Sequence, residues 1–208
     1  MSQSGADASV ARAAATRAAI EETAERMFRT LGYQKTTVAD IARDLGMSPA
    51  NVYRFFPSKA AINEAICTRI LDGLADLAWQ IARGPGSPPA RLTKLFKRFE
   101  EETISQFLKD RKIHDMVAAA MEEHWPVIQA HIRTIETAIR HIVMDGQAEG
   151  VFAHLDPEIT ARQIHAAMCI FTHPQVVAQC TEGDFSFPAD MMAAFCLRAL
   201  RPDSLDND

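Results

Sequence analysis

The segment "MSPANVYRFFPSK", from Met47 to Lys59, gathers side chains that can hydrogen-bond a nucleic acid. Asn51 carries an amide of the kind that pairs with the edge of an adenine. Tyr53 and Arg54 offer a phenol and a guanidinium to phosphate oxygens, and Lys59 adds an ammonium group. A run of aromatic residues on a helix is, taken alone, more often core packing than recognition. The elements around the segment therefore decide between the two interpretations.

Serines and prolines around this segment mark helix ends. Ser48 followed by Pro49 is typical of a helix start, since serine caps the helix and proline has no N–H to leave unpaired there. Pro57 is expected to end this helix, and Ser58 to cap the next one. The preceding stretch "VADIARDL" has the apolar spacing of a short helix, and a glycine follows it. Two short helices joined by a glycine-containing turn predict a helix-turn-helix.

The second helix of such a unit enters the DNA major groove, and its first residues meet the base edges. Those residues are Pro49, Ala50 and Asn51. Asn51 could read an adenine or contact a phosphate. Ala50 could contact a thymine methyl group or be small only to let the helix approach. Val52 and Phe56 lie four residues apart and are expected to anchor the helix from behind.

Two helix starts near this segment are candidate phosphate sites, because the N-terminal end of a helix carries a partial positive charge. The first is Thr37, which can cap the preceding short helix. The second combines Ser58 with the charge of Lys59. Tyr53, Arg54 and Phe55 are expected to turn, in different degrees, toward solvent or DNA.

Residues 36–66, "TTVADIARDLGMSPANVYRFFPSKAAINEAI", resemble the DNA-binding domain of the tetracycline-repressor (TetR-type) family of bacterial regulators. The likeness extends back through "AAIEETAERMFRTLGYQKT". Its motifs are Thr-Thr, Ile-Ala, Gly-x-Ser, a tyrosine in the third helix and Phe-Pro-Ser-Lys. The resemblance implies an all-α homodimer. Each subunit would have a three-helix DNA-binding head and a larger helical body, which binds a small molecule and dimerises through its last two long helices.

The resemblance also implies roles for single residues of the head. Phosphate contacts would come from Thr37, Tyr53 and Lys59, and the groove would be faced by Ser48, Pro49, Ala50 and Asn51. Phe55 departs from the family pattern, which often has a polar residue such as histidine there. Its role on DNA stays open.

The distribution of charge and of helix-breaking residues divides the chain into two expected domains. The whole chain carries a formal charge of −5, yet residues 1–59 hold eight basic and six acidic residues. Only this part suits a polyanionic partner. We expect a DNA-binding domain over residues 1–59, ordered from about residue 12, and a ligand-binding and dimerisation domain over residues 60–208. Helical periodicity throughout predicts about nine helices and no sheet.

The body offers candidate ligand-binding residues. Aromatic and methionine side chains could line an apolar pocket, and the resemblance places Phe99, Phe107, Met121 and Trp125 around it. His131 and His165 could be polar groups of that pocket or ordinary core histidines. No H-x3-H or H-E-x-x-H motif occurs, so neither a metal nor a cofactor is expected.

One proline in the body interrupts a helical pattern. Pro174, in "FTHPQVVAQC", is expected to lie inside a helix and bend it. The bend could shape either the dimer interface or the pocket.

Several protein classes are disfavoured. The sequence has no G-x-S-x-G, phosphate loop or dinucleotide-binding glycine pattern, so we expect no enzyme. The sequence has no run of about eighteen apolar residues, so no membrane span is predicted. The four cysteines form no C-x-x-C pair and the N-terminus lacks a secretory pattern, which together favour a reduced, cytoplasmic protein.

The favoured hypothesis is therefore a ligand-responsive transcriptional regulator. It would be a repressor that binds a palindromic DNA operator as a homodimer and is released by a small molecule. One alternative is an activator or a ligand-independent regulator of the same fold. Another is a dimeric helical small-molecule carrier whose DNA-binding head is vestigial.

Overall fold

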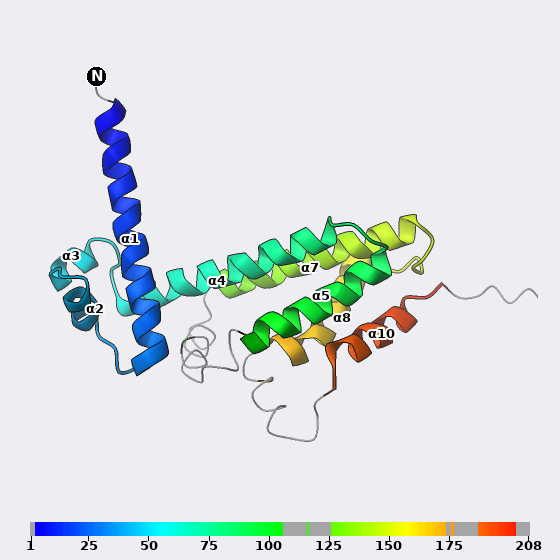
Figure 1. Ribbon diagram of the computed structural model, residues 1–208. Helices are drawn as coiled ribbons and strands as arrows, with labels where there is room; N and C mark the ends of the chain where they lie inside the picture. The colour runs from blue at the N-terminus through cyan, green and yellow to red at the C-terminus, as the bar shows by residue number, and fades with distance from the viewer. Residues whose placement is uncertain (1–2, 106–115, 117–125, 174–175, 177–186, 203–208) are drawn as a thin grey trace, which may run out of the picture. The chain divides into compact units, whose positions relative to one another are not determined.

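A computed structural model describes residues 3–105, 116, 126–173, 176 and 187–202 of the chain (Figure 1). Over these residues the protein is all-helical, which confirms the predicted fold class. The helices are α1 (Gln3–Leu31), α2 (Val38–Asp44), α3 (Pro49–Tyr53), α4 (Lys59–Ala82), α5 (Pro88–Thr103), α7 (Pro126–Ala148), α8 (Pro157–Thr172) and α10 (Ala189–Ala199).

The described residues form two compact units. The first unit comprises the chain up to Ile70 together with Met116. The second unit runs from Leu71 to residue 105 and from Pro126 onward. Helix α4 contributes residues to both units.

Helix α1 buries one apolar stripe in the first unit. Ile20, Ala24 and Phe28 have no exposed surface, as their helical spacing predicts. Leu31, three residues after Phe28, does not extend the stripe and is 49% exposed. The helix ends there, because Gly32 has a φ of 99° that turns the backbone out of the helix.

The core of the first unit also draws on a residue distant in sequence. Val52 and Phe56 are buried in this core, so the predicted anchoring of α3 is confirmed. Met116 packs into the same core and is 1% exposed. Its carbonyl accepts a hydrogen bond of 3.2 Å from the side-chain amide of the fully buried Asn63.

The second unit packs α5, α7, α8 and α10 around one apolar core. The rings of Phe96 and Phe171 meet edge to face, with centroids 6.4 Å apart. The buried guanidinium of Arg91 pairs with the Asp145 carboxylate at 2.8 Å. None of the described helices is both long enough and apolar enough to cross a membrane.

The helix that was expected to contain Pro174 ends before it, because α8 ends at Thr172. His173 is extended, with φ −83° and ψ 115°. The ring of a proline disfavours the helical conformation of the residue before it, which explains the end of the helix at this point. Pro174 itself lies outside the described residues.

Candidate nucleic-acid interface

Thr37 begins α2 with a complete capping box. The Thr37 hydroxyl accepts a hydrogen bond from the Asp40 amide at 3.2 Å, and the Thr37 amide donates to the Asp40 carboxylate at 3.1 Å. The hydroxyl also donates to that carboxylate at 2.6 Å. These bonds lower the pKa of Asp40. Both donor groups of Thr37 are thus engaged with Asp40, and a phosphate could gain the hydroxyl only by displacing the carboxylate.

Ser48 and Pro49 begin α3 as predicted. The Ser48 hydroxyl accepts a hydrogen bond from the Asn51 amide at 3.3 Å, and proline occupies the first turn. Ser48, Pro49 and Ala50 are exposed, as is Arg54, and Tyr53 is 51% exposed. The short helix therefore presents these predicted DNA-binding residues to solvent, while its Val52 is buried in the core.

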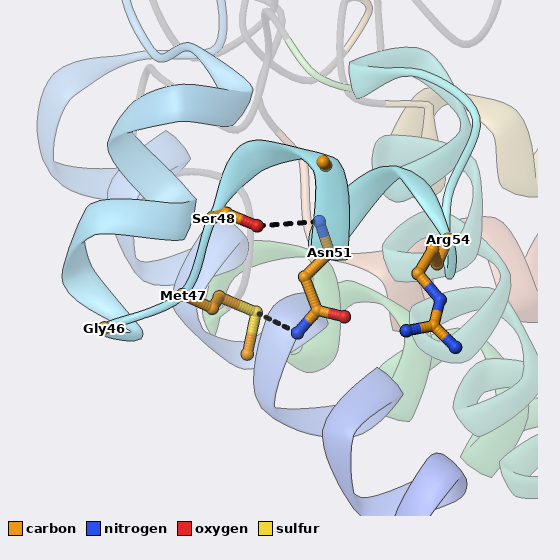
Figure 2. A pocket seen from close by; sticks show the side chains of 6 residues that line it. Gly46, Met47, Ser48, Asn51 and Arg54 are labelled. Carbon is orange, nitrogen blue, oxygen red and sulfur yellow. Dashed lines mark hydrogen bonds between the residues drawn. The ribbon is translucent and has the colours of Figure 1, made fainter.

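A shallow, open concavity of about 530 Å³ lies beside the first turns of α3 (Figure 2). Figure 2 shows the Asn51 side chain between those of Met47 and Arg54. The Asn51 amide nitrogen lies 3.9 Å from the Met47 sulfur, a weak hydrogen-bond acceptor. The lining residues are Gly46, Met47, Ser48, Ala50, Asn51 and Arg54.

Two of these lining residues, Gly46 and Met47, were missed by the sequence analysis. Met47 lies before the Ser48 cap and outside α3, so helical spacing gave no signal for it. Gly46 has a φ of 65°, a conformation in which glycine avoids the strain of a side chain. It ends the turn that follows α2 and so sets the start of α3.

Lys59, the predicted phosphate ligand, is hydrogen-bonded to backbone groups within the first unit. Its ammonium group donates hydrogen bonds to the carbonyls of Tyr33 at 2.9 Å and Thr36 at 3.1 Å. It also lies 4.3 Å from the centroid of the Tyr33 ring. Partial burial lowers the pKa of Lys59. Because an ammonium group has three donors, one N–H remains beyond the two that join the start of α4 to the segment before α2.

Arg17 ties α1 to the residues that follow α3, and the sequence analysis did not single it out. Its guanidinium donates to the Phe55 carbonyl at 3.0 Å and lies 4.0 Å from the centroid of the Phe56 ring. It also pairs with Glu21 at 3.4 Å. The side chain of Phe55 is half-buried against the core of the unit, so it contributes to packing.

The candidate effector residues belong to the second unit where they are described. Phe99 is 3% exposed within its apolar core. His165 lies on α8, with its Nδ1 3.4 Å from the Glu136 carboxylate of α7. His131 lies on α7, and its Nδ1 is buried without a hydrogen-bond partner among the described residues. Phe107, Met121 and Trp125 lie outside the described residues.

His131 predicts a pH-dependent stability. Burial, with the neighbouring His165 adding to it, lowers the pKa of His131 to about 4 from 6.5. Between about pH 6.5 and about pH 4, His131 is therefore protonated in the unfolded chain but neutral in the folded chain. The free energy of unfolding should fall as the pH drops through this range. In urea denaturation at several pH values, His131→Gln should flatten this dependence. His154→Gln, which changes an exposed histidine, serves as the control.

An unchanged slope in His131→Gln would show that His131 is not kept neutral by the fold.

No group of three or more His, Cys, Asp or Glu side chains is placed to hold a metal ion in the described part of the chain.

Comparison with known proteins places the chain among bacterial regulators. Residues 20–66 match the family model described as bacterial regulatory proteins, tetR family. Residues 88–188 match the model described as tetracyclin repressor-like, C-terminal domain. The two matches lie in the parts of the chain expected to bind DNA and to bind a ligand.

Two curated relatives are similar to the chain in sequence. The uncharacterized HTH-type transcriptional regulator YhgD of Bacillus subtilis is 27% identical over 150 residues, which cover 68% of this chain and 74% of YhgD. The nucleoid occlusion factor SlmA of Vibrio campbellii is 29% identical over 141 residues, which cover 50% of this chain and 71% of SlmA.

Solved structures share the fold across nearly the whole chain. SmeT, the repressor of the Stenotrophomonas maltophilia multidrug efflux pump SmeDEF, superposes with a TM-score of 0.68 at 19% identity, covering 90% of this chain and 91% of SmeT. A TetR/AcrR-family regulator from Thermobifida fusca superposes with a TM-score of 0.67 at 23% identity, covering 88% of this chain and 94% of that one.

Proposed function

Because the chain belongs to the tetracycline-repressor family of bacterial transcriptional regulators, we propose that it is a repressor that binds a palindromic operator as a homodimer and is released by a small molecule. The observation that supports this most directly is the exposed first turn of α3, whose polar side chains open onto the concavity at Asn51. We further propose that it acts in the cytoplasm and performs no catalysis.

Base recognition is assigned to the N-terminal turn of α3. Asn51 would pair with an adenine through its side-chain amide. The contact of this amide with the Met47 sulfur is weak, so DNA could replace it at little cost. The exposed Ala50, beside it, would allow the helix to approach a thymine methyl group. Ser48 and Pro49 would face the same groove.

Phosphate contacts are assigned to the exposed side chains around that turn. The Tyr53 hydroxyl and the Arg54 guanidinium are accessible to phosphate oxygens. Lys59 would add its third N–H while its other two position the segment before α2. Thr37 would contribute mainly by capping α2, and would contact a phosphate if its hydroxyl exchanged Asp40 for DNA.

Release by a ligand is assigned to the second unit. A dimer would place two α3 helices in successive major grooves about 34–36 Å apart. A small molecule that favours a different spacing would weaken DNA binding, with a coupling of about 1–3 kcal/mol. The proposed effector-binding residues are Phe99, Phe107, Met121, Trp125, His131 and His165.

The first test is selection of bound sequences from a random duplex pool by the purified protein at a stated salt concentration. A recovered palindrome would support a dimeric, sequence-specific regulator. The protein should also be refolded from denaturant before one selection, so that any bound effector is removed. A lack of enrichment at low salt after refolding would favour the carrier with a vestigial DNA-binding head.

Asn51→Ala is expected to weaken binding to the selected sequence by about 1–3 kcal/mol, because alanine cannot form the bidentate pair with the base. Binding to a scrambled duplex should change little. Fluorescence anisotropy at fixed salt measures both affinities. Gln80→Ala, an exposed amide residue of α4, is the matched control. An equal loss of affinity for both duplexes would show that Asn51 contacts phosphate and reads no base.

A further inference from the structure

A group of polar side chains lies between α7 and α8, within the second unit. His165 of α8 places its Nδ1 3.4 Å from the Glu136 carboxylate of α7. His131 of α7 lies close enough to His165 for the charge of that ring to oppose protonation of His131. Cys169 follows His165 by one turn of α8 and is near enough to Glu136 to respond to its charge. We call these four residues the polar cluster.

One nitrogen of the polar cluster is a buried acceptor that accepts nothing. The Nδ1 of His131 is buried and has no hydrogen-bond partner among the described residues. The ring is hydrogen-bonded to the Leu71 carbonyl of α4, and since Nδ1 makes no bond, the donor is Nε2. A neutral imidazole has one N–H, so Nδ1 presents a lone pair. A buried polar atom without a partner costs free energy, which a hydrogen-bond donor on a ligand would offset.

The polar cluster contains a carboxylate and no cation to balance it. Burial lowers the pKa of His131 to about 4. Burial also lowers the pKa of His165, since it outweighs the opposite effect of Glu136. Both rings are therefore neutral at neutral pH. Burial and the charge of Glu136 raise the pKa of Cys169, which keeps the thiol protonated. His165 is the sole ion-pair partner that Glu136 has in the described part of the chain.

The polar cluster lies at the margin of the apolar core, where a small molecule can reach it. The side chains of His165 and Glu136 are 17% and 20% exposed, so neither is closed off from solvent. Ile135, which precedes Glu136, and Met168, which precedes Cys169, are buried in the apolar core. A molecule bound here would meet hydrogen-bond acceptors at one end and hydrocarbon at the other.

We infer that the polar cluster recognises the protonated amino group of a small molecule whose remainder is apolar. An ammonium group has three N–H donors. It would donate to the Glu136 carboxylate and to the Nδ1 of His131, both of which neighbour His165, and its charge would balance that of Glu136. A carboxylate or phosphate in the same place would be repelled by Glu136 and would leave Nδ1 unpaired.

This inference rests on the proposed function, in which His131 and His165 belong to the effector site. It deepens that function by naming the chemical class of the effector and by adding Glu136 to the residues that bind it.

Octylamine, octanol and octanoate test the inference with one apolar chain and three head groups. The chain is flexible, so it adapts to the apolar space beside the polar cluster. Isothermal titration calorimetry with the full-length protein at neutral pH measures the three affinities. Octylamine should bind most tightly and octanoate most weakly.

Two variants assign the preference to residues. Glu136→Gln keeps the size of the side chain but removes its charge, and it should weaken octylamine binding about tenfold while changing octanol binding little. His131→Phe keeps a ring but removes the Nδ1 acceptor, and it should weaken the binding of both octylamine and octanol. Glu149→Gln, which changes an exposed glutamate directly after α7, is the control. Thermal unfolding checks that each variant is folded.

The outcomes separate this inference from the proposed function. The inference is overturned if octanoate binds as tightly as octylamine, if octylamine does not bind, or if Glu136→Gln leaves octylamine binding unchanged. None of these results affects DNA binding, which the duplex selection measures. If octylamine binds as expected but leaves the affinity for the selected operator unchanged, the ammonium site stands and release by a ligand at this site is overturned.

Discussion

Phe28→Ala should lower the free energy of unfolding of the first unit by about 3–5 kcal/mol, the usual cost of deleting a buried phenyl ring. Phe28 has no exposed surface, and its ring meets Tyr33 edge to face with centroids 5.2 Å apart. It lies on α1 in the core that holds α2 and α3. Since whole domains are stable by only about 5–15 kcal/mol, this loss is a large share of the stability of the unit that carries α3.

Hydrogen exchange measured by mass spectrometry tests this prediction unit by unit. Phe28→Ala should reduce amide protection in α1 to α3 and leave α7 and α8 nearly unchanged. Phe96→Ala makes the same change in the core of the second unit, where Phe96 is 1% exposed, and it should produce the opposite pattern. Equal loss of protection in both units from either variant would mean that the chain unfolds as one cooperative block.

Gly146→Ala should destabilise the second unit by about 1–3 kcal/mol, a typical cost of overpacking a core. A Cβ atom at this position of α7 would overlap the ring of Phe152. That ring cannot easily move, because Phe152 is 2% exposed. The Phe152 amide also donates to the Gly146 carbonyl at 3.0 Å. The methyl group and the ring therefore compete for the same space.

A double-mutant cycle gives this prediction a sharp control. Phe152→Leu alone should cost stability by leaving a gap, but it should also make room for the methyl group. The loss of stability in the double variant should then be smaller than the sum of the two single losses. Urea denaturation of all four proteins supplies the values. Additive losses would show that a methyl group at position 146 does not compete with the Phe152 ring for space.

Most helix boundaries could be predicted because their signals are local. Thr37 and Ser48 cap helices by bonding to amides three residues ahead, and Ser58 likewise accepts from the Ala61 amide at 3.0 Å. A side chain that satisfies its own backbone does so wherever the rest of the chain lies. The helical fold class and the family motifs followed from the same short-range patterns.

The contacts of the candidate interface could not be predicted in the same way. Lys59 was expected to face DNA, yet two of its three donors reach carbonyls 23 and 26 residues away. Arg17 bonds a carbonyl 38 residues away. These bonds depend on how closely separate backbone segments approach, and periodicity contains no information about that distance.

The sequence alone therefore determined that this protein is a helical regulator with a helix-turn-helix, because propensity, capping and motif spacing act within a few residues. Only the tertiary structure decided which polar groups form hydrogen bonds inside the first unit and which stay accessible to DNA. It also placed Met116 in the core beside Asn63, 53 residues away in sequence. Burial and hydrogen-bond partnership belong to the packed chain, and a residue's type sets only what it can bond, not what it meets.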